Sequence, residues 1–119
     1  MRMQNELGRK GEDMAVKRLL EKGYSIRERN YRFSKAEIDI IAQREGILAA
    51  VEVKMRRFGH LRSLADTVSL KKRSRLIKAT DHYVITNNLD VEVRFDIILI
   101  LHSKDKYTLE HLEAAFSHY

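Results

Sequence analysis

The chain has 119 residues, enough for one domain with a buried core, and its formal net charge is +6. It contains no cysteine, which excludes disulfide bonds, thiolate metal sites and cysteine nucleophiles. The first residues lack the apolar segment of a signal peptide, and the longest apolar runs, about five residues, are too short to span a membrane. We therefore expect one cytoplasmic domain that covers residues 1–119 and has no membrane partner.

The first predicted element is a helix over residues 5–22, with Gly23 as its stop signal. Its apolar face includes Val16 and Leu19, and Glu12 projects between these two positions. Glu12 is therefore either an inward-facing carboxylate or a partly exposed acid at the edge of the face. A strand of mixed character is predicted next, over residues 24–33.

Two further strands carry a pair of acidic residues. Residues 37–42 and 48–54 alternate in side-chain character, and residues 43–46 between them predict the turn of a hairpin. Because side chains alternate between the two faces of a sheet, this pairing brings Asp39 opposite or diagonal to Glu52 on one face. Two carboxylates are therefore expected side by side where a strand would normally present apolar side chains.

A carboxylate pair on such a face requires compensating positive charge, because removing an ionised carboxylate from water costs on the order of several kcal/mol. A divalent cation such as Mg²⁺ or Mn²⁺ could supply it, with one or two carboxylates, waters and phosphate oxygens as ligands. Lys54 lies two residues beyond Glu52 on the same face, where it could position a water or a phosphate. The alternative is an exposed face with ordinary cross-strand ion pairs, each worth under about 1 kcal/mol.

Residues 61–68 have little pattern and predict a loop, and a second helix is predicted over residues 69–86. Apolar residues follow one side of this helix: Leu70, Leu76, Ile77, Tyr83 and Val84. Its other side is basic and carries Lys71, Lys72, Arg75 and Lys78.

The strongest strand signal covers residues 91–101, which are apolar on both faces near their end. We expect this strand to be central and covered on both sides. Arg94 and Asp96 point the same way along it and predict a structural ion pair. Residues 107–112 predict an edge strand, and residues 113–116 close the chain. The expected order is helix, three strands, helix, strand and a short tail element.

Positive charge is concentrated directly after the carboxylate pair. Nine basic residues and one acid lie between Lys54 and Lys78, so this segment carries +8 and the rest of the chain −2. Affinity for nucleic acid comes mainly from neutralising phosphates, so a basic block beside the carboxylates suits a phosphodiester substrate. A solvated basic helix face is the alternative.

The acidic and basic positions together carry a family resemblance. Asp39 followed by Glu52, Val53 and Lys54, with Glu12 in the preceding helix, resembles the PD-(D/E)xK nuclease pattern, in particular that of archaeal Holliday-junction resolvases. Over nearly its whole length the sequence is similar to the YraN family of small, uncharacterised bacterial proteins. The matching segments are residues 8–12, 29–32, 37–42, 51–56 and 94–96, with Lys72 and Arg75.

The resemblance implies an α/β fold with a restriction-endonuclease-like core, in which helices flank a central mixed β-sheet. It also implies that Asp39 and Glu52 are metal ligands, Lys54 the catalytic lysine and Glu12 an additional acid. The sequence departs from these patterns at two positions. Ala36 stands where the family usually has glycine, and Ile38 precedes Asp39 where the nuclease motif is named for proline.

The sequence therefore predicts a metal-dependent nucleic-acid phosphodiesterase that uses Mg²⁺ or Mn²⁺. Glu37 is expected to be a supporting acid, and Arg56, Lys72 and Arg75 are expected to bind backbone phosphates. The expected partner is nucleic acid, with DNA favoured, while homodimer formation is left open. The alternatives are a nucleic-acid-binding module that does not cleave and a protein-interaction domain whose basic stretch binds an acidic partner.

Overall fold

The computed structural model of the protein describes residues 6–59 and 68–117. Its elements are α1 (Glu6–Glu21), β1 (Ser25–Phe33), β2 (Ala36–Arg44), β3 (Ile47–Arg57), α2 (Leu70–Thr86), β4 (Glu92–Ser103) and β5 (Lys106–Phe116). This is the predicted order, and the tail element is one long strand that includes residues 113–116. The predicted loop over residues 61–68 lies outside the described residues except for Val68, which is buried.

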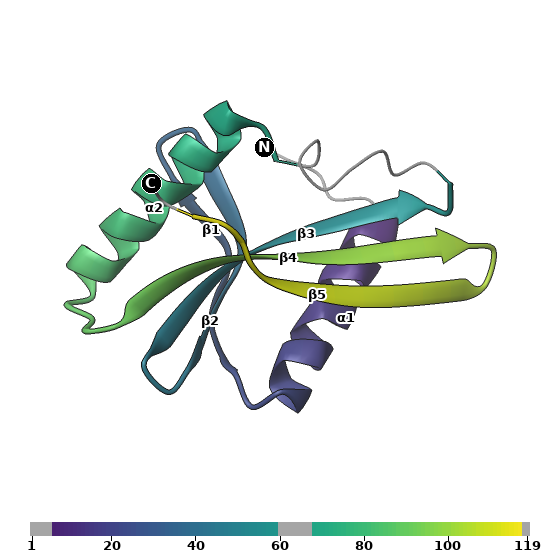
Figure 1. Ribbon diagram of the computed structural model, residues 1–119, viewed down its shortest axis with the longest axis horizontal. Helices are drawn as coiled ribbons and strands as arrows, with labels where there is room; N and C mark the ends of the chain where they lie inside the picture. The colour runs from purple at the N-terminus through teal and green to yellow at the C-terminus, as the bar shows by residue number, and fades with distance from the viewer. Residues whose placement is uncertain (1–5, 60–67, 118–119) are drawn as a thin grey trace.

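The five strands form one mixed sheet in the order β1-β2-β3-β4-β5. Neighbouring strands are antiparallel except β3 and β4, which are parallel and joined through α2. The two helices lie on opposite faces of the sheet, with α2 beside β1 and β2 and α1 beneath the middle strands (Figure 1). The predicted α/β class is confirmed, and the arrangement is compatible with a restriction-endonuclease-like core.

Local signals in the sequence define the end of α1 and the start of α2. Gly23 has φ +90°, and the N–H groups of Gly23 and Tyr24 donate to the carbonyls of Leu20 and Leu19, the pattern of a glycine-terminated helix. Ser69 is the N-cap of α2, and its hydroxyl accepts a hydrogen bond from the Lys72 N–H at 3.2 Å. Within the described residues, neither helix is both long and apolar enough to span a membrane.

Each face of the sheet has its own apolar core. The α2 side contains Ile41, Leu48, Leu76 and Tyr83, among others, whereas the α1 side contains Ala15, Leu19, Ile40 and Val51. β4 contributes Ile97 to the first core and both Ile98 and Ile100 to the second. The prediction that this strand is central and covered on both sides is therefore confirmed. The predicted ion pair on the same strand is also confirmed, with Arg94 Nη2 at 2.9 Å from Asp96 Oδ2.

Three local predictions are wrong. The hairpin turn is two residues long rather than four, because the β2–β3 ladder continues to the pair Arg44–Ile47. Leu70 is 79% exposed, since it lies in the first turn of α2 and the buried face of that helix begins at Leu76. Ile38 belongs to the α2-side core and Ile40 to the α1-side core, although alternation predicts one face for both; Ile38 lies in the part of β2 that pairs with β1 and not with β3.

Candidate active site

The acidic pair lies where β2 and β3 separate. The β2–β3 ladder ends at Ile40–Val51, and Asp39 and Glu52 are the next residues on the two strands. Asp39 Oδ2 accepts a hydrogen bond from the Val53 N–H at 2.8 Å. The Asp39 side chain therefore satisfies an amide of β3 that the ladder leaves unpaired, and this contact fixes the carboxylate between the two strands.

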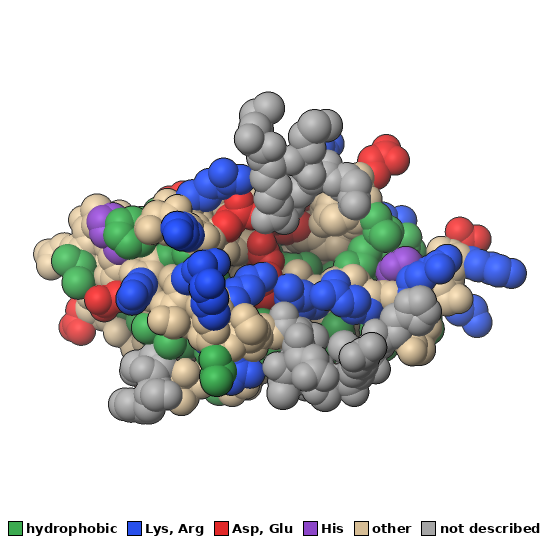
Figure 2. All heavy atoms as spheres, turned by 90° about the horizontal axis from the view of Figure 1, so that it is seen from above, with side chains coloured by type: hydrophobic (Ala, Val, Ile, Leu, Met, Phe, Trp, Pro, Cys, Tyr) green, Lys and Arg blue, Asp and Glu red, His purple; other side chains and the backbone are tan. Residues whose placement is uncertain are grey.

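A pocket of about 580 Å³ opens at this fork. β2, β3 and the start of α2 supply its walls, and it contains every predicted site residue except Glu12: Glu37, Asp39, Glu52, Lys54, Arg56, Lys72 and Arg75. In Figure 2, Lys and Arg side chains form a band across the face above the sheet, with carboxylates beside them. The predicted residues come from three elements and thus line one basic pocket with an acidic floor.

The surroundings of Asp39 disfavour the ionised form of its carboxyl group. Its side chain is buried, and the residue is 6% exposed. Burial raises the pKa of Asp39, the neighbouring Glu52 charge raises it further, and the Val53 N–H only partly offsets both, so the pKa is about 7. A carboxyl group of this kind is a candidate functional group, because a nearby cation would restore its ionised form.

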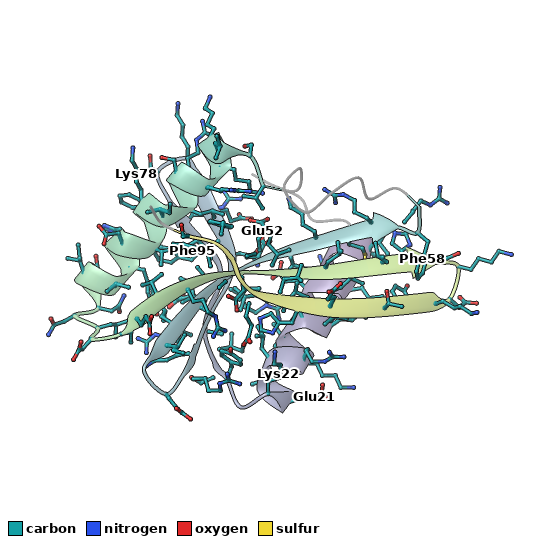
Figure 3. The ribbon with its side chains drawn as sticks, viewed as in Figure 1. Glu21, Lys22, Glu52, Phe58, Lys78 and Phe95 are labelled. Carbon is teal, nitrogen blue, oxygen red and sulfur yellow. The ribbon has the colours of Figure 1, made fainter. Side chains whose placement is uncertain are left out.

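Glu52 lies on the side of the sheet that faces α2 (Figure 3), and two lysines contact its carboxylate. Its Oε1 lies 3.0 Å from Lys72 Nζ and 3.6 Å from Lys54 Nζ. Its Oε2 is buried and has no hydrogen-bond partner among the residues that the structure describes. A buried carboxylate oxygen without a donor costs free energy, so this atom is suited to accept a hydrogen bond or to bind a cation.

The two lysines respond differently to this carboxylate. Burial lowers the pKa of Lys54, and the Lys72 charge adds to that effect, so the pKa stays below its usual value despite the Glu52 charge. Burial also lowers the pKa of Lys72, but the Glu52 carboxylate outweighs it and the net shift is upward. Lys54 therefore gives up a proton more readily than an ordinary lysine, whereas Lys72 is held as a cation.

Glu12 faces inward, as one of the two readings of the sequence expects, and is 2% exposed. Its Oε1 accepts hydrogen bonds from Asn30 Nδ2 at 3.0 Å and Arg29 Nη2 at 3.2 Å. Asn30 has φ +55° and stands across the β1–β2 ladder from Asp39. Glu12 does not line the pocket, but its charge contributes to the raised pKa of Asp39.

Two other predicted residues lie at the rim. Glu37 Oε2 accepts a hydrogen bond from Arg32 Nε at 2.8 Å, and Arg56 Nη1 donates to the Met55 carbonyl at 2.9 Å. Sequence reasoning missed Arg29, Asn30 and the contact of Lys72 with Glu52. The first two belong to a segment that carried the family resemblance, but a strand pattern alone does not reveal which residues of another element they meet.

The residues of the pocket are suited to a cation with few protein ligands. In residues 6–59 and 68–117, no three His, Asp or Glu side chains converge as a metal cluster. Mg²⁺ commonly takes only one or two carboxylates and completes its shell with waters and phosphate oxygens. Asp39 and Glu52 line the pocket, and Glu52 Oε2 has no hydrogen-bond partner within residues 6–59 and 68–117, so the pair fits that ligand set.

Comparisons with known proteins agree with the sequence resemblance. The model of the "Uncharacterised protein family UPF0102" matches residues 11–100. A UPF0102 protein of Flavobacterium psychrophilum is 50% identical over 115 residues, which cover 97% of each chain. One of Christiangramia forsetii is 49% identical with the same coverage, and one of Phocaeicola vulgatus is 43% identical over 94% of this chain and 93% of its own. The chain therefore belongs to the UPF0102 family, which is the YraN family that its sequence resembles.

Proposed function

We propose that this protein is a metal-dependent nucleic-acid phosphodiesterase, with DNA as the favoured substrate and the cytoplasm as its location. The observation that supports this best is the pair of carboxyl groups in the pocket. Glu52 Oε2 is buried and lacks a hydrogen-bond partner among the described residues, and the neighbouring Asp39 has a pKa of about 7. A site that only bound nucleic acid would gain nothing from two carboxylates among its phosphate contacts. Their presence in a basic pocket favours cleavage.

The cation would be held by Asp39 and Glu52, together with the Val53 carbonyl. When bound, Mg²⁺ or Mn²⁺ supplies positive charge beside the phosphate and increases the acidity of a water. The protein gains as well, because a divalent cation removes the repulsion between two buried carboxylates. Glu12, outside the pocket, and Glu37, at the rim of the pocket, add negative charge around Asp39 and Glu52.

The remaining residues act on the water and on the phosphates. Lys54, whose pKa is lowered, orients the attacking water and accepts its proton. Arg56, Lys72 and Arg75 bind phosphates of the nucleic-acid backbone on the α2 side of the pocket. Positioning of the water and the phosphate within one pocket then lowers the barrier to attack on phosphorus. The new P–O bond forms as the P–O bond to one sugar breaks, and the departing sugar oxygen takes up a proton from water.

The second candidate function is nucleic-acid binding without cleavage. The contact of Lys72 with Glu52 favours it, because an ammonium group can neutralise this carboxylate without any metal. A protein-interaction role would need one large apolar patch. The large apolar side chains exposed in the described part of the chain are Leu7, Leu20, Phe58, Leu70 and Ile85, which lie on α1, after β3 and on α2.

Substitution Lys54→Ala separates cleavage from binding. It leaves both carboxylates and most of the basic surface in place, so cleavage should fall by roughly 10²-fold or more while affinity for DNA changes little. The measurement is cleavage of labelled junction, flap, single-stranded and duplex DNA with Mg²⁺ or Mn²⁺, beside affinity in Ca²⁺.

Lys106→Ala is the matched control, because it removes the same charge from an exposed position on β5. It should cleave as the wild type does. If the wild type cuts none of the substrates while Lys54→Ala still binds them normally, the protein is a binding module and not a nuclease.

A further inference from the structure

Lys72 makes the shortest charged contact of Glu52. Its Nζ donates to Glu52 Oε1 at 3.0 Å, whereas Lys54 Nζ lies 3.6 Å from the same oxygen. Lys72 belongs to the first turn of α2, and Glu52 lies 20 residues earlier on β3. The ion pair therefore connects the start of the helix to the floor of the pocket.

The two partners differ in their access to solvent. The Glu52 side chain is 6% exposed, and the Lys72 side chain is 39% exposed. A lysine has a flexible four-carbon stem, so Lys72 can move its ammonium group into water at little cost. Glu52 cannot do so, because it is fixed on a buried strand. Lys72 is therefore the partner that moves when another cation takes Glu52.

The charges at the pocket floor make the replacement of Lys72 by a cation at Glu52 dependent on substrate. When both are ionised, Asp39 and Glu52 supply two negative charges, and Lys54 and Lys72 supply two positive ones as cations. A divalent cation on Glu52 would leave an excess of two positive charges and would repel the adjacent Lys72. A substrate phosphate reduces that excess and gives Lys72 a new anionic partner.

We propose that Lys72 is a positioning residue that couples cation binding to phosphate binding. It neutralises Glu52 while no divalent cation is bound, and it moves to a substrate phosphate when a cation takes Glu52. Lys72 thus weakens the affinity for the cation alone and strengthens it when nucleic acid is present. Linkage requires the reverse as well, so the cation strengthens DNA binding by the same factor. This inference rests on the proposed metal site.

Cation affinity without DNA gives the first test. Mn²⁺ and Ca²⁺ are titrated calorimetrically into the full chain as wild type, Lys72→Ala and Lys78→Ala. Lys78 is the matched control, since it lies on the same helix, is exposed and points away from the sheet (Figure 3). Lys72→Ala should bind the ion about tenfold more tightly than the wild type, equivalent to ~1.4 kcal/mol, and Lys78→Ala should change the affinity by less than about twofold.

The coupling itself gives the second test. A short DNA duplex should increase the affinity of the wild type for Ca²⁺, and Lys72→Ala should lose most of that increase. Lys72→Gln removes the charge but keeps a hydrogen-bond donor, so it should behave like Lys72→Ala if charge competition is the cause. The circular dichroism spectrum and melting curve of Lys72→Gln should match those of the wild type, which checks that the substitution leaves the fold intact.

The outcomes separate this inference from the phosphodiesterase proposal. If Lys72→Ala binds the ions no more tightly than Lys78→Ala does, the role of Lys72 is wrong, whatever the protein cleaves. Tighter binding and lost coupling without cleavage of any substrate would support the role of Lys72 and overturn the catalytic proposal. Failure of both the wild type and Lys72→Ala to bind either ion would overturn both.

Discussion

Asp39 is less stable as an anion in the folded protein than in the unfolded chain. Burial and the Glu52 charge raise its pKa from 3.8 to about 7. The folded state therefore binds more protons than the unfolded state between these two values, so raising the pH favours unfolding over that interval. This dependence is opposite in sign to that of a carboxylate stabilised by a salt bridge.

The corresponding prediction concerns Asp39→Asn in a metal-free buffer. The wild type should lose stability from about pH 4 to pH 7, by up to about 4 kcal/mol, because its raised pKa spans about three units. Asp39→Asn cannot titrate at this position and should lack this loss, so it should be the more stable protein at pH 8. Urea unfolding at pH 5 and pH 8 measures the difference.

A control and an added metal complete this test. Asp90→Asn changes an exposed acid with the same loss of charge and should follow the wild-type pH dependence. At pH 8, Mn²⁺ should raise the melting temperature of the wild type and of Asp90→Asn but not that of Asp39→Asn. Equal shifts in all three proteins would show that the ion binds elsewhere.

Among the elements, α2 matters most for the site because its first turn delivers Lys72. The cap residue Ser69 accepts the Lys72 N–H, and both residues line the pocket. A lost cap leaves backbone donors of the first turn unsatisfied. Stability and placement of Lys72 should therefore both depend on this one hydroxyl.

Ser69→Ala should destabilise the protein by about 1 kcal/mol, the usual effect of removing a serine cap. Ser74→Ala is the matched control, because Ser74 lies on the exposed side of the helix interior, where alanine has the higher helix propensity. It should leave stability unchanged or increase it slightly. Thermal unfolding of the two variants measures the contrast, and equal stability of Ser69→Ala and Ser74→Ala would mean that the cap does not hold the first turn.

The elements themselves were largely predictable, because their signals are local. Alternation identified the strands, Gly23 the end of α1, and the apolar run in β4 its central position. The predictions failed where the environment of a strand or helix decides the outcome. Nothing near Ile38 in the sequence indicates that β2 leaves β3 there, and nothing near Leu70 indicates that the first turn of α2 lies beyond the buried face.

The candidate site likewise contains residues that could be predicted from the sequence and contacts that could not. Asp39, Glu52 and Lys54 could be placed together because they lie on two strands joined by a short turn, so strand geometry relates them directly. The contacts of Lys72 with Glu52 and of Asn30 with Glu12 could not be predicted. They join elements far apart in the chain, and their formation depends on how the helices pack on the sheet.

At the scale of the whole molecule, a second buried polar network lies on the face of the sheet opposite the pocket. The pocket lies on the α2 side, whereas Asp96 is buried on the α1 side and is 0% exposed. Asp96 accepts hydrogen bonds from Arg94, from His111 Nε2 at 2.8 Å and from the Ala114 N–H at 3.0 Å. Arg94 also donates to Tyr24, just before β1, and Lys22 contacts His111, so this network joins β4 and β5 to the connection between α1 and β1.

Asp96 should therefore be a major source of stability with no part in the chemistry. Asp96→Asn removes the charge that pairs Arg94, and breaking such a buried pair should cost about 3–5 kcal/mol in the free energy of unfolding by urea. Glu113→Gln, which removes a 43% exposed partner of the same arginine, should cost under about 1 kcal/mol.

The pH dependence of this contribution has the usual sign for a paired acid. Burial raises the pKa of Asp96, but its hydrogen bonds from His111 and Arg94 outweigh burial and hold it below 3.8. The stabilisation is therefore present above that value and is lost as the pH falls through the lowered pKa. Asp96→Asn should accordingly differ most from the wild type near neutral pH, yet it should keep the melting-temperature rise with Mn²⁺, because its face of the sheet is not that of the pocket. Loss of the Mn²⁺ effect in a folded Asp96→Asn protein would show that the two faces are coupled.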